Sequence, residues 1–147
     1  MRYLGLDYGS RTIGVAISDP FLMTALGLET IRRPEEGAIK KSVARLGEII
    51  EEYGVMKIVL GYPLNLDNTE SERCAKTLGF KDRLARNFKR VEIILQDERL
   101  TTVTAKRDLV SAGATRRKLG EVVDTAAAVI ILQCYLEKLR TVDINGR

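Results

Sequence analysis

Three acidic residues of this chain stand where elements of secondary structure are expected to end or begin. Asp7 ends an apolar run near the N-terminus, Glu98 follows a later apolar run, and Asp124 lies near the start of a long apolar segment. A carboxylate at the end of an apolar strand is costly unless it is solvated, paired or bound to a metal. If the fold brings the three acids together, their repulsion favours a pair of metal ions. Two ions about 3.5–4 Å apart can stabilise both the attacking and the leaving oxygen of a phosphodiester displacement.

Each acid also has an ordinary structural interpretation. Asp7 could fix a turn, because Asp close to Gly is common turn chemistry. Glu98 could pair with a neighbour such as Arg99 or Arg107, and Asp124 could be a first-turn acid that the helix dipole favours. These interpretations have to hold for all three acids at once, so the pattern as a whole favours a metal site.

The composition narrows the chemistry further. The 147 residues include no histidine, which excludes Ser-His-Asp and Cys-His nucleophiles, histidine-ligated zinc, and a nuclease that uses imidazole as its base. Cys74 and Cys134 lie far apart and fit no metal-ligand spacing. Hydrolysis by this chain would therefore rest on carboxylates with a hard ion such as Mg²⁺, which prefers oxygen ligands.

Length and hydropathy predict one domain over residues 1–140, followed by a polar tail at 141–147. No apolar run reaches the roughly 18 residues of a transmembrane span, and the chain enters a predicted strand without a preceding signal peptide. Two isolated cysteines fit a reducing compartment. We therefore expect a cytoplasmic protein without a membrane segment.

Positive charge gathers in two places along the chain. From Glu72 to Arg90 there are seven basic residues against two acidic ones, and a second cluster lies at residues 116–118. Such patches attract polyanions, nucleic acid among them. Either patch alone would more simply be a solvated helix face. The candidates for phosphate contacts are Arg73, Lys76, Arg83, Arg116, Arg117 and Lys118.

The elements that must position these residues follow from periodicity. Apolar residues alternate on both sides of Gly9, which predicts a strand, a tight turn and a second strand over Tyr3 to Asp19. Apolar runs predict further strands at 26–31, 57–61 and 91–96. Apolar spacing and caps predict helices at 39–50 with a stop at Gly54, at 72–90 with an N-cap at Thr69 or Ser71, at 101–113 and at 121–139. The segment 114–120 is expected to be a basic loop, and the order of elements predicts an α/β fold.

Four motifs give the sequence a likeness to a known family. They are Asp7-Tyr8-Gly9-Ser10-Arg11 with Ile13-Gly14-Val15-Ala16, Gly61-Tyr62-Pro63-Leu64-Asn65, Asp97-Glu98-Arg99-Leu100-Thr101-Thr102, and Val123-Asp124-Thr125-Ala126-Ala127 leading into Ile131-Leu132-Gln133. With these motifs, in this order and spacing, the chain resembles the YqgF family over about residues 3–139. Members of that family are the pre-16S rRNA nucleases, also described as Holliday-junction resolvases.

The resemblance implies an RNase H-like fold, with a five-stranded mixed sheet and helices on both faces. It also implies that Asp7, Glu98 and Asp124 are catalytic acids that bind Mg²⁺ or Mn²⁺, as two ions. Four further residues would support the site and contact nucleic acid: Arg11, Asn65, Arg99 and Thr102. Two positions depart from the family pattern, because Tyr62 replaces a usual Leu and Asn68 a usual Gly.

The function that the resemblance implies is processing of the 5′ end of pre-16S rRNA during ribosome biogenesis. The partners would be structured RNA and the assembling small ribosomal subunit, with the protein a monomer or homodimer. One alternative is a Holliday-junction resolvase, which needs a dimer that presents two sites. Another is a non-catalytic nucleic-acid-binding domain. A similar hairpin opens the actin-like and sugar-kinase ATPases, but that architecture needs two such domains and a longer chain.

Overall fold

The computed structural model describes residues 1–64, 67, 70–97 and 116–144, with side chains described outside 116–124 and 142–144. Its centre is the predicted N-terminal hairpin, formed by β1 (Arg2–Tyr8) and β2 (Thr12–Ser18). The edge strand β3 (Ala25–Arg32) adds to β2 in the antiparallel sense. On the other side of β1, β4 (Val55–Tyr62) and β5 (Glu92–Asp97) add in the parallel sense. The five-stranded mixed sheet with the order β3-β2-β1-β4-β5 confirms the expected α/β class.

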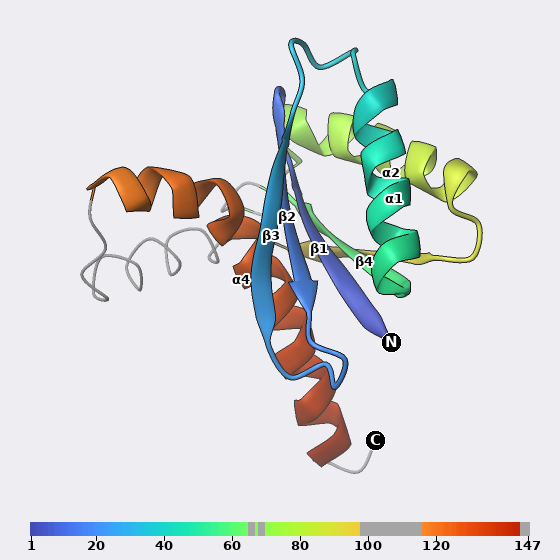
Figure 1. Ribbon diagram of the computed structural model, residues 1–147, viewed down its shortest axis with the longest axis vertical. Helices are drawn as coiled ribbons and strands as arrows, with labels where there is room; N and C mark the ends of the chain where they lie inside the picture. The colour runs from blue at the N-terminus through green and yellow to red at the C-terminus, as the bar shows by residue number, and fades with distance from the viewer. Residues whose placement is uncertain (65–66, 68–69, 98–115, 145–147) are drawn as a thin grey trace.

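The alternation of side chains along β1 divides the core into two layers. Leu4 and Leu6 belong to the cluster that α1 (Lys40–Tyr53) and α2 (Glu72–Asn87) cover. Tyr3 belongs to the cluster that α4 (Arg116–Ile144) covers, and Gly5 touches α4 as well. Figure 1 shows α4 on one side of the sheet and α1 and α2 on the other. Because residues two apart share a face, Asp7 falls on the α4 face.

The helix between β3 and β4 begins and ends close to the predicted positions. The apolar residues Val43, Leu46 and Ile49 are all buried on one side of α1. Gly54 follows the helix with a φ of 62°, and its N–H donates to the Ile50 carbonyl. Glycine adopts this left-handed conformation without the steric cost of a Cβ atom, so the predicted stop is confirmed.

The predicted ends of the last helix are wrong at both sides. Residues 116–120, expected in a loop, are the first residues of α4, because Arg, Lys and Leu are good helix formers and Gly120 costs only about 1 kcal/mol. The helix also continues past Leu139 to Ile144, so residues 141–144 of the expected tail are helical. Thr141 supports this extension by donating its hydroxyl to the Glu137 carbonyl at 3.0 Å. The predicted helix at 101–113 lies outside the described residues.

One of the two predicted N-cap residues of α2 occupies the N-cap position but does not cap the helix through its side chain. Ser71 precedes the helix, but it makes no side-chain cap hydrogen bond. Its hydroxyl instead donates to the Pro63 carbonyl at 2.6 Å and so ties the loop after β4 to the start of α2. The other candidate, Thr69, is not among the described residues. No helix in the described part of the chain is long and apolar enough to cross a membrane.

Gly5 sets how closely α4 approaches the sheet. A Cβ atom at this position would lie 2.7 Å from the Leu132 Cβ and 2.8 Å from the Ala128 carbonyl oxygen. We expect Gly5→Ala to lower the free energy of unfolding by about 1–3 kcal/mol, because overpacking forces helix and strand apart. Gly79→Ala is the control, since Gly79 lies within α2 with open space around it. That change should stabilise the protein by about 1 kcal/mol. Urea unfolding of both variants measures the difference, and a loss of stability in both would contradict this interpretation of Gly5.

Candidate active site

Asp7 is the second-last residue of β1 and pairs with Gly14 of β2. Burial raises the pKa of the Asp7 carboxyl above its ordinary value, and the nearby charge of Arg73 partly offsets this rise. A carboxylate in such a place has lost much of its hydration. A divalent cation would compensate that loss, and oxygen ligands of this kind suit Mg²⁺. The residue therefore fits a metal site.

A comparison with Asp19 tests the alternative that Asp7 merely fixes a turn. Asp19 does fix one, since its carboxylate accepts hydrogen bonds from the backbone N–H groups of Met23 and Thr24 at 2.7 and 2.8 Å. Those bonds hold the pKa of Asp19 below its ordinary value. The pKa of Asp7 moves in the opposite direction, and desolvation is the largest cause. Burial therefore dominates the pKa of Asp7, whereas the hydrogen bonds of its turn dominate the pKa of Asp19.

The contacts of α4 with β1 run in the opposite direction to the chain. The rings of Tyr135 and Tyr3 lie 6.2 Å apart, while Ala128 and Leu132 pack against Gly5. Residues nearer the N-terminus of α4 thus contact residues nearer the carboxyl end of β1. The backbone of residue 124 lies one turn before Ala128 in the same helix. The next residue, Thr125, lies against Gly27 of the edge strand β3, so the described contacts of α4 reach β3 here and do not place Asp124 beside Asp7.

The third predicted acid, Glu98, lies outside the described residues. The strand before it ends at Asp97, which is in register with Tyr62 of β4. Since β1, β4 and β5 are parallel, their carboxyl ends meet at one edge of the sheet. Within the described ranges there is no group of three metal-binding side chains, because only Asp7 of the three acids has a described side chain.

Arg33 holds the turn that follows Asp7, although no sequence pattern had pointed to this residue. Its side chain is 2% exposed, and its Nη2 donates to the Gly9 carbonyl at 2.6 Å. Its backbone N–H donates to the Arg11 carbonyl at 2.9 Å, and its Nε donates to the Glu36 carbonyl at 3.3 Å. The partner Gly9 is 24 residues away, so no local pattern could identify this contact.

A second group of contacts joins the end of β1 to α2. The Tyr8 ring stacks on Phe80 with centroids 4.2 Å apart, and the guanidinium carbons of Arg33 and Arg73 lie 4.9 and 5.3 Å from the Tyr8 centroid. Burial raises the pKa of the Tyr8 hydroxyl, and the carboxylate of Glu36 adds to the rise, while Arg33 opposes it. Glu36 also accepts from Arg73 Nη1 at 2.7 Å. The group fixes α2 against the edge of the sheet that carries Asp7.

The predicted nucleic-acid contacts on α2 lie beside this group. Lys76 and Arg83 line an open cavity of about 270 Å³ together with Tyr8, Glu36 and Phe80. Lys76 is 61% exposed, and the buried Nε of Arg83 has no hydrogen-bond partner in the described part of the chain. Arg73 is held by Glu36 at 2.7 Å, whereas Lys76 makes only a long ion pair with the same carboxylate, at 3.9 Å. Lys76 and Arg83 are therefore the better candidates to bind an anion.

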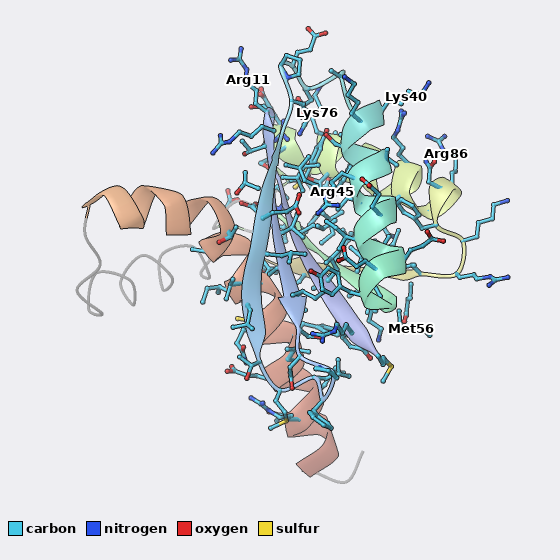
Figure 2. The ribbon with its side chains drawn as sticks, in the orientation of Figure 1. Arg11, Lys40, Arg45, Met56, Lys76 and Arg86 are labelled. Carbon is cyan, nitrogen blue, oxygen red and sulfur yellow. The ribbon has the colours of Figure 1, made fainter. Side chains whose placement is uncertain are left out.

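Of the remaining predicted contacts, Arg11 is exposed in the turn between β1 and β2, at the same end of the molecule as Lys76 (Figure 2). Residues 116–118 are placed by their backbone in the first turn of α4. The others, Asn65, Arg99 and Thr102, lie outside the described residues. The structure thus brings Arg11, Arg73, Lys76 and Arg83 to the Asp7 end of the sheet.

Several known proteins are similar to this chain in sequence or in fold. A relative from Agathobacter rectalis, named "Putative pre-16S rRNA nuclease", is 52% identical over 139 residues, which cover 95% of this chain and 96% of the relative. One of the same name from Acetivibrio thermocellus is 46% identical over 137 residues, covering 93% and 96%. Among solved structures, T. thermophilus RuvC in complex with a Holliday junction substrate has a TM-score of 0.60 at 16% identity, covering 96% of this chain and 97% of that one. That likeness confirms the RNase H-like fold.

The family assignment rests on nearly the whole chain. Residues 1–138 match the model of a family described as "RuvX: Holliday junction resolvase". The match includes the hairpin with Asp7, the basic helix α2 and the part of α4 that crosses the sheet. Together with the two close relatives it confirms the resemblance found in the four motifs. This chain belongs to the RuvX family of Holliday junction resolvases.

Proposed function

We propose that this chain is a divalent-metal-dependent nuclease whose substrate is precursor ribosomal RNA. Its family makes it an enzyme that hydrolyses phosphodiester bonds. The main support for the proposal is the environment of Asp7. A desolvated carboxylate lies at the carboxyl edge of a mixed sheet, and β5 ends at the same edge, directly before Glu98.

Asp7, Glu98 and Asp124 would together hold Mg²⁺ or Mn²⁺, as two ions. Such ions supply water activation and stabilisation of negative charge in phosphodiester hydrolysis. Glu98 directly follows β5, and Asp124 lies one turn before the contact of α4 with Gly5. The raised pKa of Asp7 supports the assignment, since a cation compensates the carboxylate for its lost hydration.

The other residues of the site position the reacting strand. Arg33 fixes the Gly9 carbonyl and therefore the backbone that follows Asp7. Lys76 and Arg83 would bind phosphates of the substrate backbone from α2, and Arg11 from the turn after β1. Arg73 keeps α2 in place through Glu36 and contributes positive charge beside Asp7. A site held in this way orients the phosphodiester, and orientation accounts for a large part of such rate enhancements.

The substrate assignment follows relatives of high sequence identity. Relatives that are 46–52% identical over nearly their whole length carry a name that refers to pre-16S rRNA. The family description refers instead to the Holliday junction, so junction resolution is the second candidate. The two differ in geometry, because paired cuts in a junction require two active sites related by a dimer axis.

One gel assay separates the two candidates. The purified protein is incubated with Mg²⁺ or Mn²⁺ and either a fragment of precursor 16S rRNA or a four-way DNA junction, with Asp7→Asn as the control. We expect metal-dependent cleavage of the RNA that the control lacks. Paired symmetrical nicks in the junction, with the RNA intact, would favour the resolvase instead. Binding of both substrates without cleavage would contradict the nuclease proposal and favour a nucleic-acid-binding domain.

A further inference from the structure

A second cavity, of about 280 Å³, lies at the N-terminus of α1, and we call it the α1 cavity. Its wall includes Arg32, Arg33, Lys40, Lys41 and Ser42, and none of its described lining residues is acidic. A space of this size exceeds the roughly 30 Å³ that one water molecule occupies in the liquid. It can therefore hold a phosphate group.

The charge at the start of α1 is the reverse of what helix electrostatics favours. The positive end of the helix dipole normally attracts acids, but the first turn of α1 contains none and begins with Lys40 and Lys41. The first N–H groups of a helix have no acceptor within the helix, and the N-cap residue Ile39 offers no side-chain hydrogen bond. An anion in the cavity would accept from these N–H groups and relieve the repulsion among the cations.

One nitrogen of Arg33 is an independent sign that the cavity takes an acceptor, although the Nη2 of the same guanidinium already lies 3.9 Å from the Glu36 carboxylate. The residue is 6% exposed and lines the cavity. Its buried Nη1 has no hydrogen-bond partner within the described ranges, and a buried charged donor without an acceptor is costly. The Nη2 of the same guanidinium holds the Gly9 carbonyl, two residues after Asp7. The α1 cavity is thus linked through a single side chain to the turn of the candidate active site.

The place of the cavity in the molecule indicates which anion it takes. Figure 2 shows Lys40 at the start of α1, at the same end of the molecule as Arg11 and Lys76. Arg32 at the end of β3 is in register with Thr12, directly beyond the turn after β1. A nucleic-acid strand at the Asp7 edge would therefore pass close to the cavity.

We propose that the α1 cavity binds a backbone phosphate of the nucleic-acid substrate, outside the candidate catalytic centre. The choice of ligand rests on the proposed function, but binding at the cavity requires no cleavage. Lys40 and Lys41 supply the charge, the first N–H groups of α1 supply directed donors, and Arg33 connects the bound phosphate to the Gly9 turn. The proposal adds Lys40 and Lys41 to the substrate contacts expected from α2.

The test compares Lys40→Gln/Lys41→Gln with Lys89→Gln/Arg90→Gln, which removes two exposed positive charges from the segment after α2. Binding of a labelled single-stranded RNA is measured over a series of KCl concentrations. At about 0.1 M salt we expect the Kd of the first variant to rise about five- to tenfold, and the slope of log K against log salt to fall by about one. The control should change Kd by less than about twofold. The melting temperature of the first variant should stay the same or rise, because like charges leave the helix N-terminus.

The backbone amides of Lys40, Lys41 and Ser42 give a direct readout by NMR. Titration with inorganic phosphate and with the same RNA should shift these amide signals in the wild type, and both effects should be lost in the Lys40→Gln/Lys41→Gln variant. Shifts with phosphate but none with RNA would overturn the proposal in favour of a site for a free anion. Equal loss of RNA affinity in both charge variants would overturn it as well. The amide shifts with RNA should persist in Asp7→Asn, so a failure of the nuclease proposal is distinguishable from a failure of this one.

Discussion

Asp7→Asn is expected to reduce metal-dependent cleavage by at least about 100-fold, the scale on which single electrostatic groups of an active site act. The substitution keeps the size of the side chain and removes its charge. An amide is a poor replacement for a carboxylate as a ligand of Mg²⁺. Because Arg11, Lys76 and Arg83 are unchanged, the Kd for nucleic acid should stay within about threefold of the wild type.

The same substitution should leave the fold intact and should not lower stability at neutral pH in the absence of divalent ions. Burial raises the pKa of Asp7, so the ionised form is disfavoured in the folded state. A carboxyl group whose pKa is raised on folding stabilises the folded state below its unfolded pKa of 3.8. This stabilisation is lost as the pH rises through the pKa of the folded state. Replacing the acid by a neutral amide removes this cost. Thermal unfolding at pH 7 in the presence of a chelator measures the effect.

Asp19→Asn is the matched control for Asp7→Asn. Asp19 also follows a strand of the hairpin, but its carboxylate accepts from the backbone of the next turn. Its substitution should lower the melting temperature and leave cleavage within about twofold of the wild type, since removing a structural hydrogen bond costs only about 1 kcal/mol. If both variants lost stability and neither lost cleavage, Asp7 would be a turn residue and the nuclease proposal would lose its main support.

Lys76→Gln combined with Arg83→Gln is expected to weaken nucleic-acid binding by about 10- to 100-fold near 0.1 M salt. Each phosphate contact changes the slope of log K against log salt by about 0.9, so the slope should fall by about two. Both residues line the cavity beside Tyr8, and among the described residues Lys76 makes only a long ion pair, at 3.9 Å with Glu36. The kcat of cleavage at saturating substrate should change less than Kd, because these residues bind the backbone away from the candidate acids.

The control is Arg86→Gln combined with Lys89→Gln, which removes the same charge from the other end of the basic run. Arg86 lies in the last turn of α2, far from Arg11 and Lys76 in Figure 2. Fluorescence anisotropy over a series of KCl concentrations compares the two variants. Equal loss of affinity would mean that net charge alone attracts nucleic acid and that α2 is only a solvated basic helix.

Much of the fold could be predicted because its elements carry local signals. Alternation on both sides of Gly9 predicted β1 and β2, and Gly54 ended α1 through a conformation that glycine adopts readily. The start and the end of α4 were predicted wrongly, because no capping residue comparable to Gly54 marks them in the sequence. Its first turn contains good helix formers before Gly120, and contacts with the sheet stabilise the helix that follows.

The chemical class of the site could be predicted from the sequence alone. Without histidine, and with Asp7 at the end of an apolar strand, carboxylate and metal chemistry was the remaining route to hydrolysis. Only the tertiary structure decided the surroundings of that acid. Arg33 reaches Gly9 across 24 residues, and Tyr8 stacks on Phe80 of α2. A basic or aromatic residue carries no local sign of such a partner, because burial and contact arise only when distant segments pack together. The α1 cavity likewise forms only because Arg33 packs beside the start of α1, and no spacing in the sequence predicts this contact.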